Sequence, residues 1–180
     1  MVRGREEVTG VLLVGGASSR FGSPKPLALF EGEPLAIRGY RLLEETFGVA
    51  IAVGKEDDYL DLPFPVEDDG RKERAAIVGL AAGLRLAETD LCVVLPTDMP
   101  HVTSSLLRAL AAAAEGAEAA VVQTGPLPGA YRRSALPAVE GRIARGEFAL
   151  TGVVEELGAR VVEGAADELT NVNTPADLVP

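Results

Sequence analysis

A glycine pair and two cationic residues follow the first apolar run of the chain. Gly15 and Gly16 come directly after the run 8–14, and Arg20 and Lys25 come next. Glycine lets the backbone turn sharply, so that consecutive N–H groups can face an anion. Arginine and lysine side chains bind phosphate oxygens through charge-assisted hydrogen bonds. The spacing therefore predicts a strand that delivers a phosphate-binding loop to the edge of a sheet.

Two common phosphate-binding patterns do not fit this loop. The P-loop of NTPases requires G-x-x-x-x-G-K-[ST], whereas Pro24 stands between Gly22 and Lys25, and Pro26 follows the lysine. The dinucleotide fingerprint requires G-x-G-x-x-G, whereas the first two glycines of this loop are adjacent. The loop is therefore a third kind of phosphate site or a glycine-rich surface loop with incidental cations.

A carboxylate follows a second apolar run, at 91–95. Asp98 lies between Pro96 and Pro100, and proline restricts the backbone of such a turn. Mg²⁺ prefers oxygen ligands and is usually held by one or two carboxylates together with phosphate and water. Asp98 is therefore a candidate Mg²⁺ ligand, and its spacing fits equally well an N-cap aspartate before the next helix.

Apolar runs of strand length alternate with segments of helical periodicity. The expected strands are Val8–Val14, Val49–Val53, Leu91–Leu95, Ala119–Gln123 and Arg160–Val162, and the expected helices are Leu35–Phe47, Ala75–Ala87, Ser104–Ala114 and Ala149–Leu157. Thr103 or Ser104 is the expected N-cap of the third helix. Such alternation is typical of a parallel sheet covered on both faces. We predict an α/β fold: a single-domain, three-layer α/β/α sandwich over residues 1–180, with a Rossmann-like, mostly parallel sheet and its site beyond the carboxyl ends of the strands.

Composition narrows the classes of function and location. The 180 residues carry a net charge of −10, which argues against a nucleic-acid surface because polyanion binding needs clustered cations. The lone cysteine, Cys92, allows no intramolecular disulfide and fits a reducing compartment. Neither a signal sequence nor an apolar run near the ~20 residues of a membrane span is evident. We expect a soluble, cytoplasmic protein.

The segment around the first loop resembles a known family. Gly-Gly, Arg, Gly and Lys in this order, followed by Gly32-Glu33-Pro34-Leu35, are similar to the sugar-nucleotide type of nucleotidyltransferase. Within that group the segment resembles the molybdenum cofactor guanylyltransferases, whose usual form is close to L-A-G-G-x-S-x-R-M-G-x-x-K-x-L. Here Val14 replaces the alanine and Phe21 the methionine.

The resemblance implies a fold, a reaction and a set of residues. The fold would be that of the nucleotide-diphospho-sugar transferases. The reaction would transfer GMP from GTP to the phosphate of molybdopterin, or molybdenum cofactor, with Mg²⁺ and release of pyrophosphate, and transient contact with cofactor-handling proteins would accompany it. The implied catalytic residues are Arg20, Lys25 and Asp98, the nucleotide-binding residues are Leu13, Val14, Gly15, Gly16, Lys25, Asp68 and Asp98, and the metal ligands are Asp98 and Asn173.

The C-terminal segment adds a third motif. Asn171-Val172-Asn173-Thr174-Pro175-Ala176-Asp177-Leu178 resembles the N-V-N-T-P-x-D-L ending of the family. The resemblance gives Asn173 a role at the metal through its amide oxygen. Taken alone, the segment fits equally a turn closed by an Asx hydrogen bond.

Several positions are less decisive or depart from the family pattern. Asp68 falls where the family uses an acid for the base, and a carboxylate can accept two N–H groups of guanine, but a solvated charged loop explains it as well. The usual G-P-L-x-G is Ala75–Gly79 here, and Gly54 stands where the family often has asparagine. The segment Gly125–Tyr131 resembles a loop that faces the acceptor.

Three functions of different kinds remain possible from the sequence. The first is the guanylyltransferase, and the second is a related enzyme such as molybdopterin cytidylyltransferase or a sugar-phosphate nucleotidyltransferase. The third is a nucleotide-binding regulatory protein without turnover. An anionic phosphate nucleophile needs no general base, so positioning and charge neutralisation would dominate catalysis.

Overall fold

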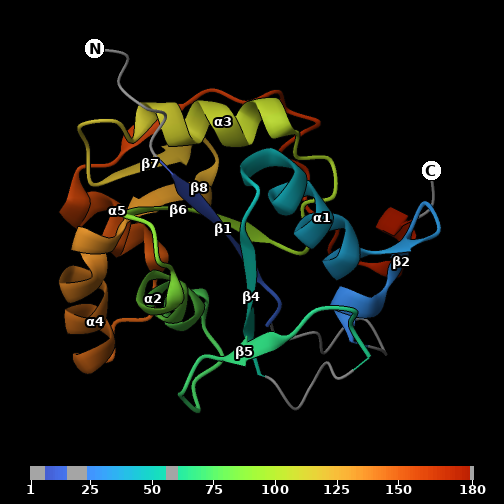
Figure 1. Cartoon of the computed structure of the whole chain (residues 1–180), viewed down its shortest axis with the longest axis horizontal. Helices are drawn as coiled ribbons and strands as arrows, with labels where there is room; N and C mark the ends of the chain where they lie inside the picture. The colour runs from blue at the N-terminus through green and yellow to red at the C-terminus, as the bar shows by residue number, and fades with distance from the viewer. Residues whose placement is uncertain (1–6, 16–23, 56–60, 179–180) are drawn as a thin grey trace.

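The computed structural model describes residues 7–15, 24–55 and 61–178. Seven strands form one sheet in the order β5-β4-β1-β6-β8-β7-β9 (Figure 1). They are β1 (Val8–Leu13), β4 (Ala50–Gly54), β5 (Val66–Asp68), β6 (Leu91–Pro96), β7 (Ala119–Val122), β8 (Gly125–Arg132) and β9 (Arg160–Val162). Six of these strands run in the same direction and β8 runs against them.

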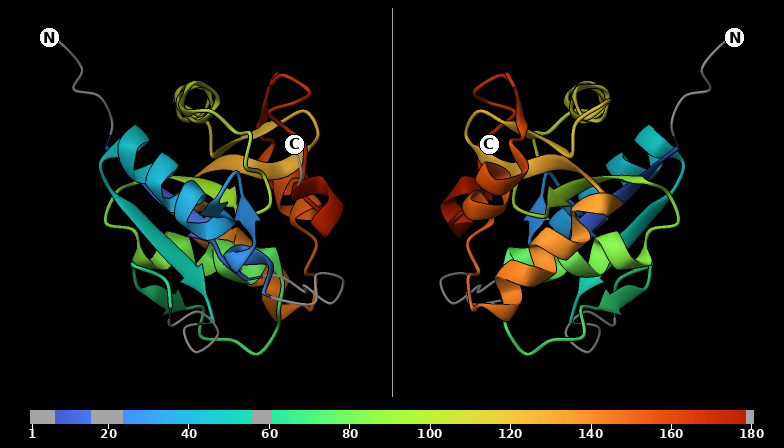
Figure 2. Two further views of the ribbon diagram at one scale, coloured as in Figure 1. Left: turned by 90° about the vertical axis from the view of Figure 1, so that its right-hand side faces the viewer. Right: turned by 90° about the vertical axis from the view of Figure 1, so that its left-hand side faces the viewer.

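Helices cover both faces of this sheet. They are α1 (Leu35–Phe47), α2 (Ala76–Leu86), α3 (Ser104–Ala113), α4 (Leu136–Ala144) and α5 (Leu150–Leu157). Helices α1 and α3 lie on one face, and α2, α4 and α5 lie on the other, as the views in Figure 2 also show. The prediction of a three-layer α/β/α sandwich with a mostly parallel sheet is confirmed.

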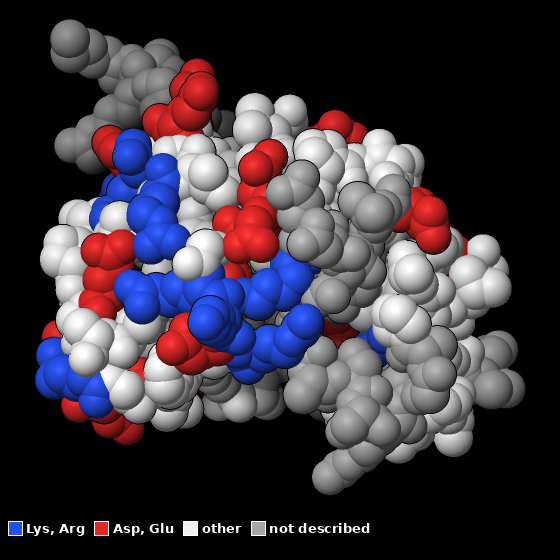
Figure 3. Space-filling model, turned by 90° about the horizontal axis from the view of Figure 1, so that it is seen from below, with Lys and Arg blue, Asp and Glu red and all other residues white. Residues whose placement is uncertain are grey.

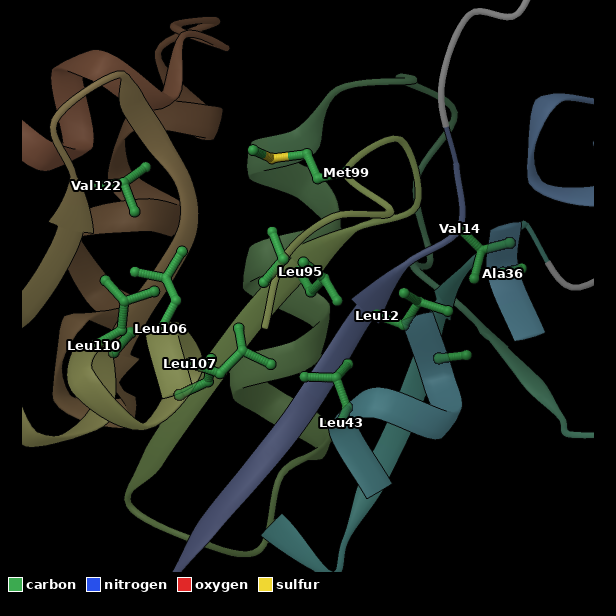
Figure 4. Close-up of a cluster of buried hydrophobic side chains, with 14 of the residues drawn as sticks. Leu12, Val14, Ala36, Leu43, Leu95, Met99, Leu106, Leu107, Leu110 and Val122 are labelled. Atoms are coloured by element: carbon green, nitrogen blue, oxygen red, sulfur yellow. The ribbon is translucent and has the colours of Figure 1, made fainter. Parts of the chain in front are cut away.

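The side chains of β1 point alternately to the two faces of the sheet and are buried on both. Leu12 packs into the layer of α1 and α3, together with Leu43 and Leu107 (Figure 4). Leu13 points to the opposite layer and packs with Ile77 of α2. Successive side chains of a strand point to opposite faces, so a continuous apolar run serves both cores. Full burial of each such leucine stabilises the fold by about 1.5–3 kcal/mol.

The predicted elements agree with the structure at their centres and differ at some ends. Helix α1 has the expected bounds, and the side chain of Thr103 caps α3 by accepting a hydrogen bond from the N–H of Leu106 at 3.2 Å. The sequence analysis missed β5, β8, α4 and a small hairpin of β2 (Leu29–Phe30) and β3 (Glu33–Pro34). The described residues also form short 3₁₀ turns at η1 (Lys25–Leu27), η3 (Arg133–Ala135) and η4 (Pro175–Leu178).

The strand order creates a switch point between β1 and β6. From β1 the chain passes through α1 to β4 on one side, and it returns through α2 to β6 on the other side. Crevices at the carboxyl ends of strands that diverge in this way bind ligands in open α/β sheets. Among the described residues, no helix has the length and apolarity that a membrane crossing requires.

Candidate active site

A pocket opens at the carboxyl ends of β1, β4 and β5. Its cavity volume is about 50 Å³, within about 400 Å³ of space that is partly open to solvent. The lining residues are Leu13, Gly15, Val53, Gly54, Lys55, Asp69, Arg74, Ala75, Ala76 and Gly79. We call this set the nucleotide pocket.

Small residues make the hollow of the nucleotide pocket. A Cβ atom at Gly54 would lie 3.3 Å from the backbone nitrogen of Gly15, and one at Gly79 would lie 2.9 Å from Cδ2 of Leu13. The ends of β1 and β4 therefore approach closely. Larger side chains at Gly54 would crowd the start of the phosphate loop.

An ion pair forms the polar part of the wall of the nucleotide pocket. The ammonium of Lys55 bonds Oδ1 of Asp69 and also the backbone oxygen of Arg71. Oδ1 of Asp69 accepts a further hydrogen bond, of 3.0 Å, from the N–H of Arg71, and the N–H of Asp69 donates to the backbone oxygen of Gly54 at 2.9 Å. These bonds fasten the loop after β5 to the end of β4.

The acidic residue on the pocket wall is Asp69, whereas the sequence analysis selected its neighbour Asp68. Asp68 is exposed, and its Oδ1 accepts a 2.6 Å hydrogen bond from the N–H of Gly70. Lys55 and Arg74 also line the nucleotide pocket, and neither is among the site residues that the sequence predicts. The face that carries these loops presents basic side chains beside acidic ones (Figure 3).

The second part of the site surrounds Asp98, just after β6. Lys25 of η1 places its Nζ 3.2 Å from Oδ2 of Asp98, and Nδ2 of Asn171 donates to the same oxygen at 3.3 Å. The backbone oxygen of Asp98 accepts a 2.8 Å hydrogen bond from the N–H of Val172. We call Lys25, Asp98, Asn171 and Asp177 the Asp98 cluster.

Oδ1 of Asp98 is buried and has no hydrogen-bond partner among the described residues. A buried, unpaired carboxylate oxygen is costly, so the atom is suited to a cation ligand. No group of three or more His, Cys, Asp or Glu side chains that could hold a metal occurs in the part of the chain that the structure describes. One carboxylate with neutral oxygens fits an ion such as Mg²⁺ that is held largely by phosphate and water.

Asp177 belongs to the C-terminal part of this cluster. The backbone N–H of Asn173 donates to its Oδ2 at 2.9 Å, and that of Thr174 at 2.8 Å. These two hydrogen bonds, with a smaller contribution from the charge of Lys25, lower the pKa of Asp177. The predicted metal ligand Asn173 is exposed, and the asparagine that contacts Asp98 is Asn171.

The other predicted site residues fall in three groups. Leu13 and Gly15 line the nucleotide pocket. Val14 is fully buried against the layer of α1, and its N–H donates to the backbone oxygen of Val53 at 2.9 Å. Arg20 and Gly16 lie outside the described residues.

Two further residues from the sequence analysis have structural roles. Tyr131 is fully buried in β8, and its hydroxyl donates to the backbone oxygen of Pro126 at 2.6 Å, so the ring packs inside the fold. Cys92 is buried in β6, and this burial raises the pKa of its thiol to about 12. A thiol with such a pKa is almost entirely protonated near neutral pH and is a poor nucleophile.

Solved structures share this fold. The chain superimposes on molybdopterin-guanine dinucleotide biosynthesis protein A from Archaeoglobus fulgidus with a TM-score of 0.76 and 24% identity, over 94% of each chain. At this identity the likeness concerns the fold alone.

Sequence comparisons identify the class and the family. The chain is 31% identical to a protein of Pelotomaculum thermopropionicum named probable molybdenum cofactor guanylyltransferase, over 96% of this chain and 91% of the relative. It is 30% identical to the molybdenum cofactor guanylyltransferase of Burkholderia vietnamiensis, over 87% and 77%. The protein is a nucleotidyltransferase. The profile of the MobA-like NTP transferase domain matches residues 10–161, and the chain belongs to this family.

Proposed function

We propose that the protein transfers GMP from GTP to the phosphate of molybdopterin and releases pyrophosphate. The observation that carries the proposal is a pocket at the carboxyl ends of β1 and β4 together with Asp98, which follows the adjacent strand β6 and whose Oδ1 is buried without a partner among the described residues. The names of relatives that match most of the chain support guanine and molybdopterin as the substrates.

In this reaction an oxygen of the acceptor phosphate forms a bond to the α-phosphorus of GTP. The bond from that phosphorus to the bridging oxygen of the β-phosphate breaks, and the electron pair leaves with pyrophosphate. The nucleophile is already an anion, so the site needs no general base. Rate acceleration then comes from alignment of the reactants and from charges placed in advance.

The charged residues of the site have distinct roles in this proposal. Lys25 and Arg20 hold the triphosphate and neutralise the charge that builds on the leaving pyrophosphate. Asp98 holds Mg²⁺, with an amide oxygen from Asn173 or Asn171 as a second protein ligand. When bound, Mg²⁺ supplies positive charge to the phosphate oxygens. Leu13, Gly15 and Asp69 contact the nucleoside, together with Val14, Gly16 and Asp68 as the sequence predicts.

The remaining proposals concern location and partners. We infer that the protein acts in the cytoplasm as a single nucleotidyltransferase domain. We further infer brief contacts with the proteins that supply molybdopterin and receive the product, because a reactive cofactor is best passed directly between proteins.

The direct test is product formation. Purified protein with Mg²⁺, molybdopterin and GTP should yield the guanine dinucleotide, detected by mass spectrometry, and an equal amount of pyrophosphate. Parallel reactions with CTP, ATP and UTP should yield much less product. Absence of a product with GTP, or faster reaction with CTP, would refute the proposal.

A further inference from the structure

The Lys55–Asp69 ion pair is deeply buried, although it lies beside a pocket that is open to solvent. Only 14% of the Lys55 side chain and 8% of the Asp69 side chain are exposed. Removing two charges from water costs free energy that their mutual attraction often does not recover. Since both side chains line the nucleotide pocket, ligand recognition is a reason to keep the pair.

The hydrogen bonds of the pair leave a defined set of groups for a ligand. An ammonium has three N–H donors, and Lys55 uses two of them, on Asp69 and on the backbone of Arg71. Oδ1 of Asp69 accepts two hydrogen bonds within the described part of the chain, and Oδ2 accepts none there. A carboxylate oxygen can accept two hydrogen bonds. The ion pair therefore offers one donor and two acceptor sites.

Guanine is the base that uses all three of these sites. Its Watson–Crick edge carries the O6 acceptor beside the N1–H and N2–H donors. Adenine offers one ring acceptor and one amino group, so it leaves an acceptor site unused. Cytosine and uracil each carry a second acceptor, at O2, for which the Lys55–Asp69 pair has no second free donor.

The position of Lys55 follows from the glycine before it. Gly54 ends β4 against the backbone of Gly15 and has no side chain to offer the pocket. Lys55 is thus the first residue after β4, and its side chain lies on the pocket wall. The backbone bonds of Asp69 and Arg71 hold the two charged groups side by side.

We propose that Lys55 selects the base: its free N–H donates to O6 of guanine while Asp69 accepts from N1–H and N2–H. This inference rests on the proposed function and adds a residue that determines substrate specificity. It makes the pocket selective for a 6-keto purine nucleotide.

The test compares two lysine-to-methionine variants with three nucleotides. Lys55→Met removes the donor and keeps the length of the side chain, and Lys72→Met makes the same change at an exposed lysine nearby. The ligands are GTP, ITP and 2-aminopurine riboside triphosphate, which lacks both the 6-keto oxygen and the N1–H of guanine, so each variant is compared with the wild type on the same nucleotide. Affinities are measured by calorimetry, and each variant is checked by its melting temperature.

A lost hydrogen bond to a charged donor weakens binding about ten- to a hundredfold. Lys55→Met should lose this much affinity for GTP and ITP, and little for the 2-aminopurine nucleotide. Lys72→Met should bind all three as the wild type does, and Lys55→Arg should recover part of the GTP affinity.

Two results would overturn the assignment of Lys55 while leaving the proposed function intact. One is an equal loss of affinity for all three nucleotides, which would mean that Lys55 only positions Asp69 and does not contact the base. The other is unchanged GTP affinity in Lys55→Met with the wild-type melting temperature. Failure of the wild type to bind or use GTP would instead refute the proposed function.

Discussion

The nucleotide pocket and the Asp98 cluster satisfy their charged groups in opposite ways. In the pocket, Lys55 and Asp69 bond each other and the nearby backbone, so each charge has a partner before a ligand binds. In the cluster, Oδ1 of Asp98 is buried without a partner in the described residues. The difference suggests that the pocket is built for binding and that the cluster is completed only when the reactants arrive.

The two regions also differ in how far apart in the sequence their contacting residues lie. The pair Lys55 and Asp69 joins two adjacent strands, β4 and β5. Asp98 is contacted by Lys25 and Asn171, each 73 residues away in sequence. Changes in the pocket should therefore act mainly on nucleotide affinity, and changes in the cluster should act mainly on turnover.

The largest expected effect is that of Asp98→Asn. Removing a preorganised charge from a catalytic site lowers kcat by about a hundred- to a thousandfold. Because Asp98→Asn also removes the proposed metal ligand, we expect its effect at the upper end of this range. The melting temperature should change little, because removing the charge of a carboxylate whose Oδ1 is buried without a partner in the described residues offsets the lost charge pairing with Lys25. Steady-state pyrophosphate release measures kcat. The control is Asp90→Asn, at the residue directly before β6 begins. Loss of both folding and activity in Asp98→Asn would contradict the prediction.

The second effect is that of Lys25→Ala, which should lower kcat about a hundredfold or more. The ammonium of Lys25 lies 3.2 Å from Asp98, where it can reach the phosphates of a nucleotide bound next to it. The same assay measures the change, and Lys72→Ala is the matched exposed control. Near-wild-type turnover would remove Lys25 from the catalytic residues.

The third effect belongs to the pocket and should appear in KM. A methyl group in Gly54→Ala would lie 3.3 Å from the backbone nitrogen of Gly15. Displacing that backbone should raise KM for GTP about tenfold, the equivalent of roughly 1.4 kcal/mol, with kcat little changed. Gly141→Ala, in α4, should leave both constants unchanged. A fall in kcat at constant KM would contradict the division between the two regions.

The smallest effect distinguishes the two asparagines of the C-terminal segment. Asn171 is exposed and donates one 3.3 Å hydrogen bond to Asp98. Asn171→Ala should therefore lower kcat about five- to tenfold, which corresponds to the weak end of the free energies of hydrogen bonds to charged groups. Asn173→Ala should have the larger effect if Asn173 ligates the metal as the sequence predicts. Titration of activity with Mg²⁺ separates these outcomes, because loss of a ligand raises the Mg²⁺ concentration needed for half-maximal activity.

Most of the architecture could be predicted because apolar periodicity marks the main elements clearly. Helix α1 has the predicted bounds, and β1, β4, β6 and β7 differ from prediction only at their ends. Strand β8 was missed because Pro126 and Pro128 interrupt it, and proline is unusual inside a sheet. Helix α4 was missed because Gly141 and Pro137 weaken its helical pattern.

The Asp98 side of the site could be predicted in part, and the polar wall of the pocket could not. The sequence predicts Asp98 and Lys25 as site residues because each stands in a distinctive turn with prolines, and the structure brings their side chains together. The sequence predicts Asp68, whereas Asp69 lines the pocket, since sequence spacing does not fix how the chain leaves β5. Lys55 resembles any surface lysine until the pairing of β4 with β5 brings it to a carboxylate 14 residues away.

The central claim is that binding and turnover are separated between the two regions. The most direct measurement is GTP affinity without divalent metal, together with kcat with Mg²⁺, for Asp98→Asn and Gly54→Ala in parallel. We predict that Asp98→Asn binds GTP within about threefold of the wild type, since less than 1 kcal/mol is at stake, but turns over about a thousandfold more slowly. Gly54→Ala should show the reverse pattern. Parallel loss of affinity and turnover in both variants would contradict the claim.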